Sequence, residues 1–292
     1  METVTVERNG PVKRIVMNRP RVHNAFNEVL IAELTRAFRE VEAEAGGEGA
    51  PRVVVLTGAG KSFSAGADLH WMGKMKAYTF EENLADAMAL AELMSLIHRC
   101  PLPTVARVNG AAIGGGVGLL AACDLSVASG TAVFSLSEIK LGLVPACIAP
   151  YVIERIGRRA ARELFLTGER FGAEKALAVG LVNRAAPPEG LDAEVEGLVR
   201  RLVTSGPGAL RAAKELIRTV PVLDHERVKA YTAEMIARLR VSDEGQEGIR
   251  AFFEKRNPAW AEAAEEALRS MEGGKETGAA PEKGGDRTGG TP

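Results

Sequence analysis

A run of three glycines, Gly114 to Gly116, restricts the possible folds of this chain more than any other feature. The run stands between a predicted strand, PTVARVNG, which ends at Gly110, and a predicted apolar helix, GGGVGLLAACD. Glycine leaves the backbone N–H groups open, and the N-terminus of a helix carries a partial positive charge. The sequence therefore predicts a strand–glycine–helix unit whose backbone can bind an oxyanion.

The sequence on either side of this unit predicts alternating strands and helices. Residues 3–17 alternate apolar and polar side chains around Asn9-Gly10, a dipeptide that favours the tight turn of a β-hairpin. The other expected elements are a helix over Asn24–Glu44, a buried strand over Arg52–Gly58, a helix from Thr79 with Glu82 as its capping-box partner, and short strands over Leu125–Ala128 and Ala132–Ser135. This order predicts an α/β domain that extends to about residue 190.

The C-terminal part of the chain differs in character. Helical periodicity is expected over Pro207–Thr219, Asp224–Arg240 and Asp243–Arg256. Beyond Met271 the sequence is rich in glycine and charge and lacks large apolar residues, so it cannot offset the entropy of ordering. The predicted organisation is an α/β core over residues 1–195, a helical region over 196–270 and a disordered tail over 271–292.

Composition excludes several classes of function. The chain has 37 basic and 38 acidic residues, so no general field attracts nucleic acid or an anionic membrane surface. No window approaches the roughly 18 apolar residues of a membrane span, and the N-terminus lacks the order of a secretory signal. The three cysteines are odd in number and lie in apolar surroundings, and no histidine or cysteine spacing matches a metal site. We expect a cytoplasmic protein with reduced thiols and no bound metal.

One competing pattern overlaps the glycine run. Gly116 to Ala121 satisfies the dinucleotide-binding pattern G-x-G-x-x-G/A, and Glu138 follows at about the 20-residue spacing of its acidic partner. However, seven residues separate PTVARV from Gly116, whereas the dinucleotide pattern requires a tight turn directly after the strand. We therefore do not expect an NAD-dependent oxidoreductase.

Three segments together resemble one known superfamily. SFSAGADL (Ser62–Leu69), VNGAAIGGGVGLLAACDL (Val108–Leu125) and FSLSEIKLGLVPA (Phe134–Ala146) are similar to the crotonase, or enoyl-CoA hydratase/isomerase, superfamily. The resemblance covers about residues 3–262 and is closest to bacterial 3-methylglutaconyl-CoA hydratases of leucine degradation. It implies an α/β spiral of strand–strand–helix turns, followed by C-terminal helices that assemble homotrimers or homohexamers.

The resemblance also implies particular site residues. The oxyanion donors are the backbone N–H groups of Ala67 and Gly115, because an enolate formed from a thioester needs two convergent donors. Gly114 and Gly115 bind the acyl thioester, and the side chain of Trp71 packs over the pocket. Coenzyme A arrives as part of the substrate, so no separate cofactor is expected. Its implied contacts are Arg19, Arg21, Ala65, Ala67, Asp68, Leu69, Phe252 and Lys255, the last two often from a neighbouring subunit.

The number of acid–base residues in the site distinguishes the possible reactions of the superfamily. Hydratases of this superfamily use two glutamates, one to activate water for attack at C3 and one to protonate C2. Glu138 matches the second position, and burial raises the pKa of such a carboxyl toward a value useful for proton transfer. Gly118 stands at the first position and has no side chain. A glycine here is also typical of the hydratase branch that the chain resembles. In that branch a substrate carboxylate or a bound water would have to take the role of the missing glutamate.

Hydration of an enoyl-CoA is therefore the expected activity. A single carboxylate also suits a Δ3,Δ2-enoyl-CoA isomerase, which moves one proton between C4 and C2, and a non-catalytic CoA-binding oligomer is a third possibility. A methylglutaconyl group has a second carboxylate, for which His70, Lys74 and Lys76 in the segment HWMGKMK offer positive charge. The segment ACIAP, residues 146–150, replaces a glycine-rich loop found in many relatives and predicts an unusual acyl group.

Overall fold

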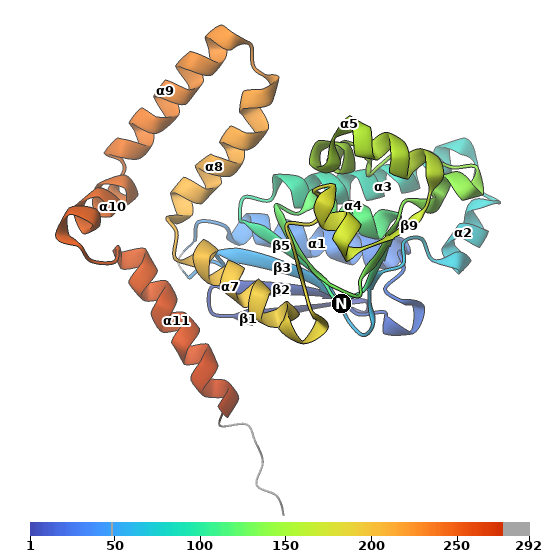
Figure 1. The fold of residues 1–292 in the computed structure, drawn as a ribbon, viewed down its shortest axis with the longest axis horizontal. Helices are drawn as coiled ribbons and strands as arrows, with labels where there is room; N and C mark the ends of the chain where they lie inside the picture. Colours follow the sequence, from blue (N-terminus) through green and yellow to red (C-terminus); the bar gives the residue numbers. More distant parts are fainter. Residues whose placement is uncertain (48, 277–292) are drawn as a thin grey trace, which may run out of the picture.

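Two β-sheets organise the core of the computed structural model, which describes residues 1–47 and 49–276 (Figure 1). The larger sheet has six strands in the order β1–β2–β3–β5–β7–β10. Strands β1 and β2 form an antiparallel hairpin, and the other neighbours pair in parallel. The strands are β1 (Val4–Asn9), β2 (Val12–Met17), β3 (Val53–Gly58), β5 (Thr104–Val108), β7 (Leu125–Ser129) and β10 (Arg184–Ala186).

A smaller sheet of four strands lies beside the first. Its order is β4–β6–β8–β9, and its strands are β4 (Ser62–Ser64), β6 (Ala111–Ile113), β8 (Val133–Ser135) and β9 (Arg170–Gly172). Each of β3, β5 and β7 in the larger sheet is followed directly by a strand of the smaller sheet, and then by one or more helices. The predicted α/β spiral of strand–strand–helix turns is therefore confirmed, although β4 and β6 were not expected from the sequence.

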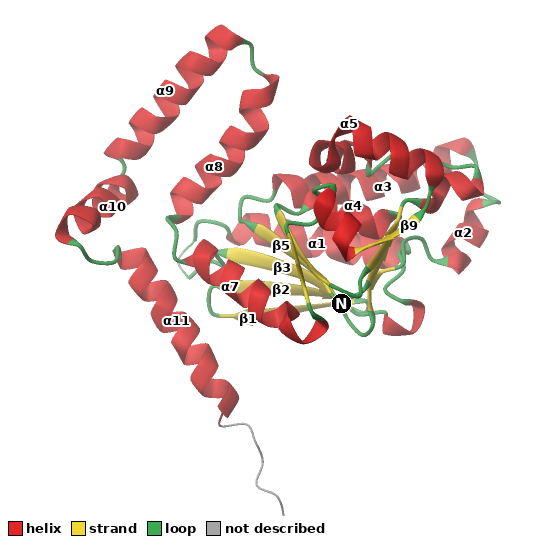
Figure 2. Cartoon of the chain, in the orientation of Figure 1, coloured by secondary structure: helices red, strands yellow, loops and turns green. Residues whose placement is uncertain are grey.

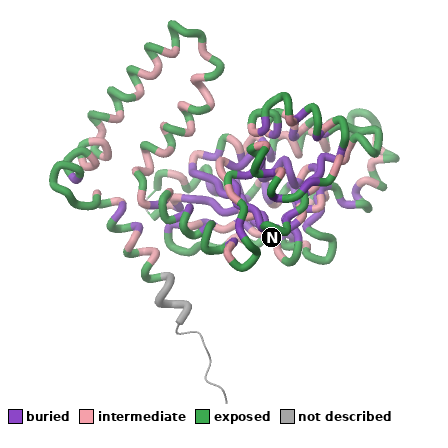
Figure 3. Tube along the Cα trace, viewed as in Figure 1, coloured by how far each residue is buried: buried purple, intermediate pink, exposed green. Residues whose placement is uncertain are grey.

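Helices cover the sheets (Figure 2). The helices of the core are α1 (Glu28–Glu44), α2 (Leu69–Met75), α3 (Phe80–Arg99), α4 (Gly115–Ala122), α5 (Ala149–Thr167), α6 (Ala173–Ala178) and α7 (Leu191–Val203). Short 3-10 helices are η1 (Pro20–Val22), η2 (Ser137–Leu141), η3 (Pro188–Gly190) and η4 (Val220–Val222). The buried residues are concentrated in this part of the molecule (Figure 3).

Strand β3 lies between two hydrophobic clusters, which explains why its sequence is continuously apolar. Val54 and Leu56 pack into the large hydrophobic cluster that includes α1, α3 and α4, whereas Val53 and Val55 pack into a smaller cluster with α7. Successive side chains of a strand point to opposite faces, so a strand covered on both faces needs apolar residues at every position.

The caps of the first long helices explain their starting points. The helix predicted from Asn24 begins only at Glu28, because the Asn27 side chain accepts a hydrogen bond from the Leu30 N–H at 2.9 Å and caps the helix. Asn24 instead has a positive φ of 55° and belongs to the preceding turn. The capping box of Thr79 and Glu82 is present at the start of α3 as predicted.

The last four helices form an arm that extends from the core (Figure 1). They are α8 (Pro207–Thr219), α9 (His225–Val241), α10 (Asp243–Glu254) and α11 (Ala259–Glu276). The predicted boundary at residue 195 lies inside α7, which packs on the larger sheet, so the arm begins with α8. Helix α11 includes the first six residues of the tail predicted to be disordered, and residues 277–292 lie outside the described residues. No helix in the described ranges has the length and hydropathy to cross a membrane.

Candidate active site

A cavity of about 670 Å³ contains most of the residues singled out from the sequence. Its walls come from the loop before α2, from α2 and α3, and from the segment that joins η2 to α5, and its base includes Gly114 and Gly115. Two other hollows, of about 680 Å³ between α1 and α3 and about 540 Å³ beside α10, contain neither the glycine run nor Glu138. The first cavity is therefore the candidate active site.

The loop before α2 places one backbone N–H toward the cavity. Ala67 forms a parallel bridge with Phe26, in which the Phe26 N–H donates to Gly66 O and the Asp68 N–H donates to Phe26 O. Successive N–H groups of an extended segment point to opposite sides, so the Ala67 N–H faces away from Phe26. Within the described ranges this N–H has no backbone acceptor. It is free to donate to a ligand.

The glycine run places a second free N–H close to the first. Gly114 has a positive φ of 51° and caps α4, and Gly115 is the first residue of that helix, where the N–H has no intrahelical acceptor. A Cβ atom built on Gly66 would lie 3.8 Å from Gly115 N, so the two loops are adjacent. A Cβ on Gly115 itself would meet the Phe26 ring at 2.4 Å. Only glycine fits here, and the predicted pair of oxyanion donors lies together.

Glu138 contributes the acid–base group of the cavity. The residue lies on η2, and its Oε1 would be 2.8 Å from a Cβ atom placed on Gly114. Its Oε2 is buried and has no hydrogen-bond partner in the part of the chain that the structure describes. Burial raises the pKa of this carboxyl above 4.5. An unpaired carboxyl of raised pKa next to the oxyanion donors is suited to accept and return a proton.

The position of the missing first acid is filled by packing. A Cβ atom on Gly118 would lie 2.1 Å from Cγ2 of Ile148 and 2.7 Å from its Cβ, and Met94 Cε would be 3.3 Å away. These contacts leave no space for a glutamate side chain. Glycine at position 118 is thus coupled to isoleucine at position 148, which the sequence did not reveal.

The same packing argues against a dinucleotide site. The expectation that no strand closely precedes the glycine run was wrong, because β6 ends at Ile113. However, a Cβ atom on Gly116 would meet Ser64 O at 2.5 Å, and Gly118 packs on Ile148. These two glycines face protein atoms, so their backbone cannot approach a pyrophosphate.

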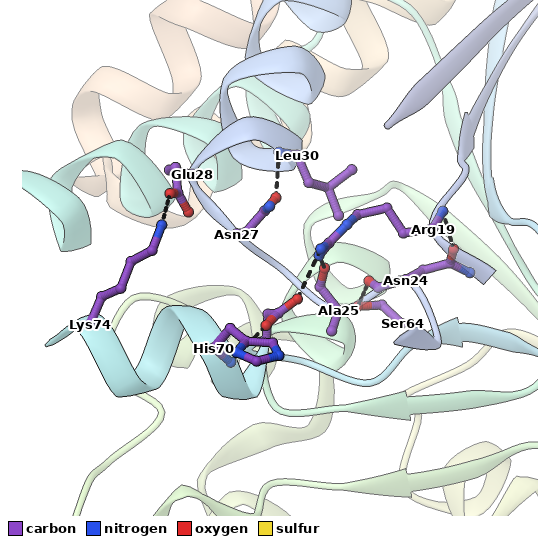
Figure 4. Close-up of polar contacts among 10 residues, drawn as sticks. Arg19, Asn24, Ala25, Asn27, Glu28, Leu30, Ser64, His70 and Lys74 are labelled. Carbon is purple, nitrogen blue, oxygen red and sulfur yellow. Dashed lines mark hydrogen bonds and ion pairs between the residues drawn. The ribbon is translucent and has the colours of Figure 1, made fainter. Parts of the chain in front are cut away.

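Arg19 supports the oxyanion loop (Figure 4). Its guanidinium forms an ion pair with Asp68 at 2.9 Å and also donates to Ala25 O, and Asp68 caps α2 by accepting from the His70 N–H at 2.8 Å. Burial opposes ionisation of Asp68, but the hydrogen bonds from His70 and Arg19 outweigh it and lower its pKa below 3.8. Arg19 therefore has an anionic partner within its own chain, and its contact with a CoA phosphate stays a prediction.

The remaining residues of the predicted CoA-binding loop differ in exposure. Ala65 is half-buried, Ala67 is exposed, and Leu69 is 83% exposed at the start of α2. Arg21 is exposed and forms no side-chain hydrogen bond or ion pair with the described residues. These groups are available to an incoming ligand.

The cations predicted to meet a substrate carboxylate do not line the cavity. Lys74 forms an ion pair with Glu28 at 2.6 Å, and Figure 4 shows this pair between α2 and α1. His70 and Lys76 are exposed and are absent from the cavity wall. Trp71 does line the cavity, as predicted from the resemblance, and is only 4% exposed.

Phe252 and Lys255 lie far from the cavity of their own chain. Both belong to the end of α10, where Phe252 is 78% exposed. Figure 1 shows α10 at the opposite end of the molecule from α2, which forms part of the cavity wall. One chain therefore does not bring these two residues to its own candidate site.

Sequence reasoning missed Asp86. This residue lies on α3 and lines the cavity together with Asn83, Ala87 and Leu90. The four positions follow the i, i+3, i+4, i+7 spacing of one helical face, which was the available signal. The sequence did not indicate which face of α3 would meet the glycine run.

Comparison with known proteins identifies the family. The family model described as enoyl-CoA hydratase/isomerase matches residues 7–263. This match spans most of the chain, and the chain belongs to the enoyl-CoA hydratase/isomerase family.

Individual relatives agree in sequence and fold. A crystal structure of an enoyl-CoA hydratase from Shewanella pealeana is 43% identical, with a TM-score of 0.83 over 88% of this chain and 96% of that one. A Thermus thermophilus protein named "Putative enoyl-CoA hydratase" is 39% identical, over 87% of this chain and 99% of its own. The "Crotonyl-CoA hydratase" of Syntrophomonas wolfei is 30% identical over 87% of this chain and 95% of its own.

Proposed function

We propose that this chain is an enoyl-CoA hydratase that adds water across the C2=C3 bond of an enoyl-CoA thioester. The observation that carries the proposal is the position of Glu138, whose unpaired carboxyl shares one cavity with the free N–H groups of Ala67 and Gly115. The two N–H groups would bind the thioester oxygen and stabilise the enolate that forms when hydroxide adds to C3. Each such donor typically contributes about 3–4 kcal/mol to the transition state.

Glu138 would serve both proton transfers. As the water oxygen bonds to C3, its proton passes to the Glu138 carboxylate and the electrons of the double bond move onto the thioester oxygen. The same proton then passes from Glu138 to C2 as the enolate collapses. These proton transfers need only one acid. The packing of Ile148 against Gly118 leaves no space for a second one.

Binding of the coenzyme A part is proposed to involve two subunits. The backbone of the Ala65–Leu69 segment would contact the adenine, and the exposed Arg21 is placed to meet a phosphate. Phe252 and Lys255 would come from the arm of a neighbouring subunit. No separate cofactor takes part, because the coenzyme A is a portion of the substrate.

The exposed surface of the arm supports a homotrimer or a homohexamer. Within the described chain, α8 and α9 contain no buried residue. Large apolar side chains exposed on the arm are Ile217, Val222, Ile236, Val241, Ile249, Phe252 and Phe253. A monomer that exposed this surface to water would be poorly stable, so we propose that other subunits cover it. The three free cysteines agree with a reducing, cytoplasmic location.

An isomerase is the second candidate, because a single acid in the cavity is sufficient for it. Glu138 would remove a proton from C2 of a 3-enoyl-CoA, which gives a dienolate bound at the thioester oxygen, and would return it to C4 without adding water. Product analysis separates the two activities. We expect crotonyl-CoA to yield 3-hydroxybutyryl-CoA, whereas an isomerase would leave crotonyl-CoA unchanged and convert but-3-enoyl-CoA into it.

The finer proposal of 3-methylglutaconyl-CoA as substrate rests on the segments ADLHWM, GGGVGL and SEIKLGLVPACIAPYVIERIG. Its second carboxylate requires a cation, and among the described residues the cavity wall has no lysine, arginine or histidine. Hydration of 3-methylglutaconyl-CoA and crotonyl-CoA, measured in parallel, decides between a dicarboxylate and an uncharged acyl group.

A further inference from the structure

The charged groups of the cavity are all acidic. Among the described residues that line it, the ionisable side chains are Glu138, Asp86 and the thiol of Cys147. The nearest lysine of α2, Lys74, is held by Glu28 outside the cavity wall. The mechanism uses Glu138, and it gives no role to Asp86.

Asp86 does not stand in for the missing first acid. The position of that acid is marked by Met94, whose Cε would be 3.3 Å from a Cβ on Gly118. Met94 lies eight residues further along α3, which corresponds to about 12 Å of helix. Asp86 therefore lies about two turns of helix from the position of the missing acid, and it shares the cavity wall with Met75 and Trp71.

Asp86 lines both the cavity and the hollow between α1 and α3, and the wall of that hollow includes Arg36 and Arg39. Asp86 forms no ion pair in the described part of the chain, and burial raises its pKa above 3.8, with Glu28 adding repulsion. Trp71 lines the same cavity, and its buried indole N–H has no hydrogen-bond partner among the described residues. An anionic ligand group entering this part of the cavity would meet a second negative charge in a partly dry site, which disfavours its binding.

We propose that Asp86 determines acyl specificity by excluding anionic acyl groups, so that the cavity accepts uncharged enoyl-CoA substrates. This inference rests on the proposed acyl-CoA function and names the substrate class of that site. Trp71 positions the carboxylate, and the apolar residues Met72, Met75 and Leu90 contact the uncharged chain.

The test compares two saturated acyl-CoA ligands of nearly the same shape, measured by calorimetry at pH 8 on the intact oligomer. Glutaryl-CoA ends in a carboxylate, and 5-methylhexanoyl-CoA ends in an uncharged isopropyl group. We expect the wild type to bind the uncharged ligand at least about tenfold more tightly. The isosteric Asp86→Asn variant should reduce this Kd ratio by about tenfold, mainly through tighter binding of glutaryl-CoA.

Glu92→Gln is the matched control, because Glu92 lies on the same helix but pairs with Arg39 outside the cavity. It should leave the ratio unchanged. A ratio that Asp86→Asn does not alter, or an equal loss of affinity for both ligands, would overturn the specificity role. Because the ligands are unreactive, this result is independent of hydration: absent turnover of any enoyl-CoA contradicts the proposed reaction, whereas an unchanged ratio contradicts the role of Asp86.

Discussion

At the scale of single residues, the site combines groups that stability alone would not favour. Glu138 has a buried oxygen without a hydrogen-bond partner among the described residues, and Gly114 adopts a positive φ beside it. A buried polar atom without a partner typically costs about 1–3 kcal/mol. Such a cost is expected where a group must be free to exchange a proton with a ligand.

The stability of a Glu138→Gln variant tests this cost. Burial raises the pKa of Glu138 in the folded protein above 4.5, so ionisation at higher pH penalises the folded state and not the unfolded chain. The neutral glutamine avoids the penalty. We expect the variant to have a Tm about 2–4 °C above the wild type at pH 8, with the difference shrinking as the pH falls toward 4.5. Thermal unfolding followed by circular dichroism measures the Tm of both proteins. A variant with the same Tm as the wild type at pH 8 as well as at pH 4.5 would contradict the prediction.

Packing at Gly118 gives a second prediction. Gly118→Ala places a Cβ within 2.1 Å of Ile148 Cγ2 and should destabilise the protein by about 1–3 kcal/mol. Ile148→Ala removes that Cγ2 atom, so part of the loss should be recovered when both changes are combined. A double-mutant cycle from chemical denaturation measures the coupling. Strictly additive effects would show that these two side chains do not compete for one space.

The sequence predicted some of these residues and not others, for physical reasons. Glu138, Ala67 and Gly115 were predicted from contiguous motifs that resemble the superfamily, and the structure brings all three to one cavity. Asp86, Ile148 and the Asp68 partner of Arg19 were not found, since each role depends on a contact between segments distant in sequence. Tertiary packing decides such contacts, and periodicity carries no information about them.

At the scale of secondary-structure elements, the loop before α2 depends on one ion pair. Arg19 connects the end of β2 to Asp68, and the adjacent Ala67 carries a proposed oxyanion donor. The pair is mostly buried, with side-chain exposures of 19% and 7%. Its geometry therefore sets where the Ala67 N–H points.

Removal of the guanidinium should affect both stability and catalysis. We expect Arg19→Ala to cost about 1.5–3 kcal/mol, the usual contribution of hydrogen bonds to a charged group, and to lower kcat at least about tenfold by displacing Ala67. Arg36→Ala is a suitable control, because Arg36 is exposed on α1 and only weakly paired with Glu33. Normal kcat in Arg19→Ala would mean that the loop keeps its geometry without the pair.

Elements with strong local signals were predicted well from the sequence. The hairpin around Gly10, the capped start of α3 and the whole of α8 agree with the expected bounds. The three-residue strands β4 and β6 were missed, because such short strands have no detectable periodicity and form by pairing with neighbouring strands, β4 with β6 and β6 also with β8. Helix α1 begins later than expected because Asn27 caps it.

At the scale of the whole molecule, the arm separates the proposed CoA contacts from the catalytic cavity. Phe252 lies on α10 and Lys255 caps its C-terminus, and α10 lies at the opposite end of the molecule from α2 (Figure 1). One chain alone cannot use them at its own cavity in this arrangement. In the proposed assembly, a neighbouring subunit would supply these two CoA contacts to each cavity.

This arrangement makes Lys255 testable. Lys255→Ala should raise KM for crotonyl-CoA about fivefold to tenfold and leave KM for crotonyl-pantetheine, which lacks the nucleotide phosphates, unchanged. Mixed oligomers of Lys255→Ala and Glu138→Gln subunits should recover part of the lost affinity, because some active cavities would then face an intact Lys255. Lys229→Ala, on the exposed part of α9, is the control. An equal rise in KM for both substrates would exclude a phosphate contact.

The central claim is that Glu138 transfers the protons of a hydration reaction. The most direct measurement is the decrease of the ultraviolet absorbance of the enoyl thioester with crotonyl-CoA, for the wild type, Glu138→Gln and the exposed control Glu163→Gln. We predict loss of the absorbance with the wild type and the control, and a rate at least about 100-fold lower with Glu138→Gln. Equal rates for Glu138→Gln and the wild type, or no loss of absorbance with either, would contradict the claim.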